Sequence, residues 1–151
     1  MNPTSTKQQL TQALKDAMRA KDDLRKSTIR LAMAAIKNAE IERRGELDEP
    51  TLLGILQKEV KLRRETIDEA RRAGRDELVA EAEAEIAVLE QFLPQPLTQM
   101  ELENLAREVI TEVGADSPRQ MGQVMKNLMP RIQGRADGKQ ASLIVQRLLR
   151  E

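Results

Sequence analysis

Apolar residues recur along this chain at steps of three, four and seven, and strand-like alternation is never sustained. Such steps keep apolar side chains on one face of an α-helix. The first 93 residues contain four such stripes, which begin at Leu10, Leu24, Leu53 and Leu78. Phe92 is the only aromatic residue, so a β-sheet would lack many of the side chains that stabilise it. The pattern predicts an all-α fold.

The second stripe has the widest apolar face. Its expected core positions are Leu24, Leu31, Ala35 and Ala39, widened by Ile29, Met33 and Ile36. Gly45 follows two arginines and is expected to end this helix, because glycine adopts the left-handed conformation common at helix ends. Asp48 is expected to cap the third helix. Gly74 is expected to end the third helix, and Asp76 to start the fourth.

The segment 93–97 reads Leu-Pro-Gln-Pro-Leu and interrupts the helical pattern. Each proline lacks a backbone N–H and restricts the residue before it, so the middle of this segment cannot be helical. We therefore predict a proline-rich hinge between an N-terminal four-helix domain, residues 1–93, and a three-helix tail, residues 94–151. Thr98 and Glu101 predict a capping box at the start of the tail.

The tail shows three shorter helical patterns. Gly114 is expected to end the first, Ser117 to cap the second and Asp137 to cap the third. Pro130 predicts an end or a kink in the second helix. Three methionines at steps of four are predicted to fill the tail's core: Met121, Met125 and Met129.

Charge is balanced over the whole chain, with 25 basic and 25 acidic residues, but its distribution is uneven. The segment 117–150 carries seven cations and one acid, Asp137. The cations are Arg119, Lys126, Arg131, Arg135, Lys139, Arg147 and Arg150. A local field of this sign attracts phosphates or an acidic protein surface.

Other charged runs have simpler interpretations. Lys58, Lys61, Arg63 and Arg64 lie among acids at helical ion-pairing distances, which favours a solvated, self-paired surface. Glu77, Glu81 and Glu85 share one helix face without histidine or asparagine, a poor cage for a metal ion. That stripe is expected to be a solubilising outer face.

The composition excludes several kinds of covalent, metal-binding and catalytic site. The chain has no cysteine and no histidine, so disulfides, thiolate metal sites and the usual catalytic base are absent. A Ser–Lys pair stays formally open, but no phosphate-binding loop of the G-x-x-x-x-G-K-[ST] type is present. We expect no catalytic residues, no metal and no cofactor. Without a secretory signal or an apolar run of about 20 residues, we also expect a cytoplasmic protein that does not enter the membrane.

Several separate motifs, in one order, resemble the YqeY-like family, also called the GatB/YqeY family. They lie at residues 17–22, 31–41, 58–66, 92–97 and 121–139. In that family the three-helix tail is similar to the C-terminal tail of the B subunit of the glutamine-dependent aminoacyl-tRNA amidotransferase, which is implicated in holding tRNA. The resemblance implies a helical module that contacts tRNA or another RNA. It does not imply the amidotransferase reaction, because the catalytic and ATP-using part of that subunit has no counterpart here.

The candidate RNA-binding residues are Lys126, Arg131, Arg135, Lys139, Arg119 and Arg147. Four of them surround the turn formed by Gly134, Asp137 and Gly138. That turn has two interpretations, a plain helix stop and cap, or an anion site at a helix N-terminus. Asp137 complicates the second interpretation, because it would occupy one of the free N–H groups and repel an anion.

Three functions remain open. The first is a non-catalytic module that binds tRNA or another structured RNA through phosphate and shape, without DNA sequence readout. The second is a protein-interaction adaptor that docks on a translation-related enzyme. The third is an accessory factor for a carbon–nitrogen ligase, an amidotransferase with glutamine as amide donor. The first is the hypothesis that the basic tail favours.

Overall fold

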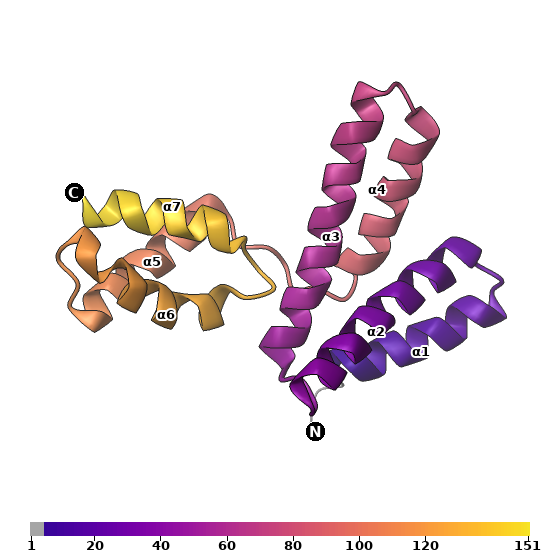
Figure 1. The fold of residues 1–151 in the computed structure, drawn as a ribbon, viewed down its shortest axis with the longest axis horizontal. Coiled ribbons are helices and arrows are strands. Elements are labelled where there is room, and N and C mark those ends of the chain that lie inside the picture. Colours follow the sequence, from indigo (N-terminus) through magenta and orange to yellow (C-terminus); the bar gives the residue numbers. More distant parts are fainter. Residues whose placement is uncertain (1–4) are drawn as a thin grey trace. The chain divides into compact units, whose positions relative to one another are not determined.

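The computed structural model describes residues 5–151 and is all-α, with no strand among those residues (Figure 1). The helices are α1 Thr6–Arg19, α2 Asp23–Arg43, α3 Glu49–Arg72, α4 Asp76–Glu90, α5 Gln99–Val113, α6 Met121–Ile132 and α7 Gly138–Leu149, with a short 3-10 turn η1 at Pro118–Gln120. The predicted fold class is confirmed. In the described part of the chain, none of the helices combines the length and apolarity that crossing a membrane requires.

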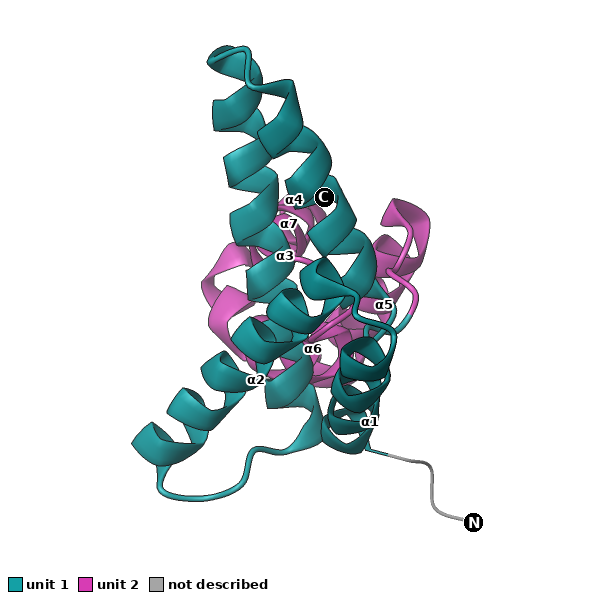
Figure 2. Cartoon of the chain, turned by 90° about the vertical axis from the view of Figure 1, so that its right-hand side faces the viewer, with its two compact units in different colours: residues 1–94 teal, residues 95–151 magenta. Residues whose placement is uncertain are grey.

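The chain divides into two compact units, residues 1–94 and 95–151, which Figure 2 colours separately. Unit 1 contains α1 to α4, and unit 2 contains α5 to α7. The division falls within the proline-containing segment, one residue after the boundary that we placed at residue 93. Each unit has a hydrophobic core of its own.

Unit 1 consists of two helical hairpins, α1 with α2 and α3 with α4 (Figure 1). The fully buried Leu10, Ile29, Leu56 and Leu89 contribute one large side chain from each helix. Phe92, just beyond α4, closes the same core at 9% exposure. The four stripes read from the sequence therefore meet in one core.

The orientation of α2 differs from the expected one. Its buried residues are Thr28, Ile29, Ala32 and Ile36, whereas Leu31 is 55% exposed. The core lies on the side of α2 that carries Ile29 and Ile36, which widened the expected stripe, rather than at the centre of that stripe. Leu24 still packs against the core, and Ala35 and Ala39 are half-buried. Apolar residues surround most of α2, so their period alone did not decide which side would face the core.

Most helix starts follow the expected capping chemistry. Asp48 caps α3 by accepting a hydrogen bond from the Thr51 N–H at 3.0 Å. The Thr51 side chain and then its N–H, both as hydrogen-bond donors, lower the pKa of the Asp48 carboxyl. The end of α2 differs from expectation, because Arg44 rather than Gly45 adopts the left-handed conformation, with φ +61°. A non-glycine residue is uncommon in that conformation.

Unit 2 packs α5, α6 and α7 around a core that includes Ala106, Val124, Leu128 and Val145. The three methionines Met121, Met125 and Met129 are partly buried against that core, in agreement with the sequence pattern. Pro130 does not end α6, which continues to Ile132. It lies in the last turn, where few intrahelical bonds remain to be lost.

The start of α5 is capped less completely than predicted. The Thr98 hydroxyl accepts a hydrogen bond from the Glu101 N–H at 3.1 Å. The Glu101 carboxylate, however, accepts from the Thr98 hydroxyl rather than from its backbone N–H. Only half of a reciprocal capping box is therefore formed.

Candidate nucleic-acid interface

The turn between α6 and α7 is built by local backbone chemistry. Gly134 adopts φ +84°, a conformation that side chains disfavour, and is buried. Asp137 caps α7 by accepting a hydrogen bond from the Lys139 N–H at 3.1 Å. The Arg135 carbonyl accepts a hydrogen bond from the Leu97 N–H at 2.9 Å, which ties the turn to the segment before α5. Asp137 thus occupies one of the N–H groups that an anion would need.

Two of the seven cations turn toward acids of α5. The Arg131 guanidinium forms a two-pronged contact with the Glu112 carboxylate. The hydrogen bond to Glu112 raises the pKa of Arg131, with smaller contributions from the charges of Glu112 and Glu108. The Arg147 guanidinium lies 3.0 Å from the Glu103 carboxylate.

Glu103 is shared between two helices. Its carboxylate also accepts from Arg107 at 3.1 Å, while Arg107 reaches Glu151 at 3.6 Å. Hydrogen bonds from Arg147 and then Arg107 hold the pKa of Glu103 below its usual range. This ion-pair network joins α5 to α7 and to Glu151. Arg147 is therefore already paired with a carboxylate.

Arg135 occupies a third environment. Its Nε donates to the backbone carbonyl of Gln95 at 3.3 Å. It borders a shallow, open depression whose other lining residues are Leu97, Glu101, Asn104, Leu105, Arg107, Glu108 and Thr111. Two acids, Glu101 and Glu108, and two cations, Arg107 and Arg135, line this depression, so its formal charges balance.

The remaining four cations, Arg119, Lys126, Lys139 and Arg150, are exposed. Within the described part of the chain their side chains form no ion pair or hydrogen bond. Neither α6 nor α7 contains an acidic residue. Arg119 lies in η1 just before α6, and Arg150 is the C-cap of α7. We call the outer surface of α6 and α7, together with these two adjoining residues, the α6–α7 face.

Helical spacing shows on which side of its helix each of three of these side chains lies. Lys139 and Arg150 are eleven residues apart, which is close to three turns, so they lie on one side of α7. Met129 packs against Gly138, where an added Cβ would lie 3.0 Å from the methionine Cε. Lys126 is two residues from each of the buried Val124 and Leu128, so it projects from the outer side of α6, away from the core.

The six predicted binding residues thus fall into different surroundings. Arg119, Lys126 and Lys139 belong to the α6–α7 face, Arg131 and Arg147 pair with α5, and Arg135 lies in the depression. Arg150, part of the basic run but not among those six, joins the α6–α7 face. Its spacing of eleven from Lys139 is the sequence signal that could have found it.

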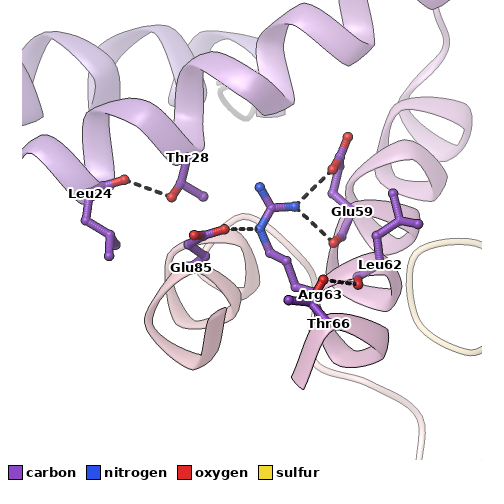
Figure 3. A network of polar contacts seen from close by, with 7 residues as sticks. All are labelled: Leu24, Thr28, Glu59, Leu62, Arg63, Thr66 and Glu85. Carbon is purple, nitrogen blue, oxygen red and sulfur yellow. Dashed lines mark hydrogen bonds and ion pairs between the residues drawn. The ribbon is translucent and has the colours of Figure 1, made fainter. Parts of the chain in front are cut away.

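The second basic run, in unit 1, is neutralised at its two arginines, whereas Lys58 and Lys61 are exposed and form no ion pair in the described residues. Arg63 lies between Glu59 and Glu85, at 2.9 Å and 2.6 Å, and its side chain is only 11% exposed (Figure 3). Arg64 reaches Glu90 at 3.5 Å on the open surface. The pairing with Glu59 was expected from helical spacing, but the partners on α4 were not.

The expected outer face of α4 also needs correction. Glu77 and Glu81 are exposed, but Glu85 points toward Arg63 (Figure 3). Among the residues that the structure describes, no group of three or more acidic side chains could hold a metal ion.

Comparison with models of known protein families shows which family the chain belongs to. The model of the family described as Yqey-like protein matches residues 7–149. The chain belongs to the YqeY-like family. The match includes all seven helices of this YqeY-like chain almost completely, in both units.

Curated relatives of this YqeY-like chain share the name "Altered inheritance of mitochondria protein 41, mitochondrial". The protein from Lachancea thermotolerans is 38% identical over 112 residues, which are 72% of this chain and 60% of the relative. The protein from Eremothecium gossypii is 45% identical over 85 residues, 56% of this chain and 46% of the relative. The chain therefore spans about half the length of the curated relatives it matches.

These relatives correct one expectation. Their printed names place them in mitochondria, which contradicts the cytoplasmic location that we derived from composition. The prediction was wrong because a lack of cysteine and of long apolar runs does not distinguish one aqueous compartment from another.

Proposed function

We propose that unit 2 of this YqeY-like chain is a non-catalytic module that binds a structured RNA, and that this RNA is tRNA. The observation that carries the proposal is the α6–α7 face, where four unpaired cations lie on η1, α6, α7 and the C-cap of α7, and neither α6 nor α7 contains an acid. Unpaired cations are available to phosphates, whereas Arg131 and Arg147 would first have to leave their carboxylate partners. The resemblance to the tail of the amidotransferase B subunit supports the same substrate class.

The mode of contact follows from the composition. Phe92 is the only aromatic residue, and it is buried in the core of unit 1. Unit 2 therefore has no aromatic platform on which an unpaired base could stack. Arginine and lysine contacts to the phosphate backbone, guided by the shape of the folded RNA, are the remaining source of affinity. Such binding weakens steeply as salt increases.

An electrophoretic shift assay with total tRNA across a salt series tests the proposal. Replacing Arg119, Lys126, Lys139 or Arg150 by alanine should each reduce the slope of log affinity against log salt by about one. Arg131→Ala and Arg147→Ala should reduce it less, because those cations are already paired.

Lys15→Ala is the matched control, since Lys15 is an exposed lysine of α1 in unit 1 without an ion pair in the described chain. It should leave the slope unchanged. Absence of tRNA binding at low salt, or binding that does not respond to salt, would refute the proposal. Equal effects of Lys15→Ala and Lys126→Ala would refute the assignment to the α6–α7 face.

A further inference from the structure

A second regular surface lies on α2 in unit 1. Five exposed residues, Ser27, Leu31, Ala34, Asn38 and Ile41, follow one another at steps of four, three, four and three. Leu31 and Ile41 remain 55% and 65% exposed. This spacing is that of the a and d positions of a coiled coil, which face a partner helix. We call this row the α2 seam.

The α2 seam is separate from the face that α2 uses for folding. Ile29, Ala32 and Ile36 point into the core of unit 1 and are at most 2% exposed. Single exposed apolar residues are normal on protein surfaces. Leu31 and Ile41, however, are large and follow the heptad spacing along one helix, so they form a second apolar face of α2 that has no partner.

The two edges of the seam differ in charge and in access. In the same heptad frame, the g positions within α2 are Arg30 and Lys37, both exposed and without an ion pair in the described residues. On the opposite edge, Thr28 is buried, and its hydroxyl donates to the Leu24 carbonyl at 2.8 Å (Figure 3). Ala35 on that edge is half-buried. Glu42, the last residue of that edge, is exposed. The basic edge is therefore open at both of its positions, and the opposite edge is open only at its end.

We propose that the α2 seam binds an acidic amphipathic helix of a partner protein. Leu31 and Ile41 would insert between apolar residues of that helix. Asn38 at a central a position would favour one register, because its amide needs a polar partner. Carboxylates along the edge of the partner would face Arg30 and Lys37, an arrangement that speeds association and rejects basic helices.

The charges argue against a second copy of this chain as the occupant. In an antiparallel pair, g positions face g positions, so Arg30 and Lys37 of one copy would face the same cations of the other and repel them. In a parallel pair, g faces the e position five residues further along. Only Lys37 would then meet an acid, Glu42, while Arg30 would face Ala35.

Two synthetic helical peptides of about three heptads test the inference with the full chain. Both carry leucine at a and d. One has glutamate at every e and g position, and its twin has lysine there. Fluorescence anisotropy should show that the acidic peptide binds at least about ten times more tightly than the twin. Leu31→Asp and Ile41→Asp should each weaken that binding by about tenfold or more, and Lys37→Glu should shift the preference toward the lysine peptide.

Leu143→Asp is the matched control, because Leu143 is 61% exposed on α7 in unit 2 and lies outside the seam. It should leave peptide binding unchanged, and circular dichroism should show native helix content in every variant. Equal binding of the two peptides, or binding of neither, would overturn the proposal. Sedimentation showing a dimer that Leu31→Asp dissociates would also overturn it, since the occupant would then be a second copy.

Discussion

At the scale of single residues, two neighbouring arginines with the same formal charge differ in burial and in ion pairing. Arg63 is nearly enclosed between Glu59 and Glu85, whereas Arg64 beside it is 66% exposed and reaches Glu90 at 3.5 Å. A partly buried cation with two carboxylate partners is retained because its loss would leave both carboxylates without compensation. An exposed pair gains little, because water and salt screen it.

This contrast predicts unequal costs of removing the two arginines. Arg63→Ala should lower the free energy of unfolding by about 2 kcal/mol, after allowing for the partial exposure of its partners. Arg64→Ala should change it by less than about 0.5 kcal/mol. Urea unfolding of the two variants measures the difference, and similar values for both would show that the enclosure of Arg63 is irrelevant to stability.

At the scale of elements, the turn between α6 and α7 combines a structural and an electrostatic role. Asp137 holds the first turn of α7 through the Lys139 N–H. The same carboxylate is a negative charge next to the α6–α7 face. The cap requires a side-chain oxygen, and asparagine supplies one without the charge.

Substitutions at Asp137 separate the two roles. Asp137→Ala should cost about 1 kcal/mol of unfolding free energy, because the cap is lost. Asp137→Asn should stay within about 0.5 kcal/mol of the original stability and should strengthen tRNA binding at low salt. Urea unfolding and the electrophoretic assay give the two readouts. If Asn destabilises as much as Ala, the hydrogen bond to Lys139 is not what stabilises α7.

At the scale of the whole molecule, the chain contains two separate hydrophobic cores, one in each unit. Cooperative unfolding follows the contacts within a core. Two cores therefore favour two unfolding transitions, for which a single two-state analysis would not be valid. Proposals for unit 2 and for α2 can consequently be tested by variants that disturb only one unit.

Core substitutions should act on one unit at a time. Ile36→Ala in unit 1 and Val124→Ala in unit 2 each remove buried methyl groups, at an expected cost of about 2 kcal/mol or more. Hydrogen exchange in a urea series, read on peptides from each unit, should show a shift only in the unit that carries the substitution. Equal shifts in both units for both variants would mean that the chain unfolds as one body.

The sequence by itself determined the helices, their approximate ends and the proline-containing segment between the units. Caps such as Asp48 and Asp137, glycine stops such as Gly114, and the restrictions of proline act through neighbouring residues, so they can be read locally. The same local patterns carried the resemblance to the YqeY-like family. The cellular compartment is not encoded by such patterns, and that prediction failed.

Tertiary structure alone decided which side of α2 is buried and which cations remain unpaired. Leu31 and Ile29 look equally suited to a core, and only packing against the other helices of unit 1 chose Ile29. Arg131 and Arg147 find carboxylates on α5, which is distant in sequence but adjacent in the fold. Ion pairing depends on the distance between side-chain atoms, and that distance is set by helix packing rather than by position along the chain.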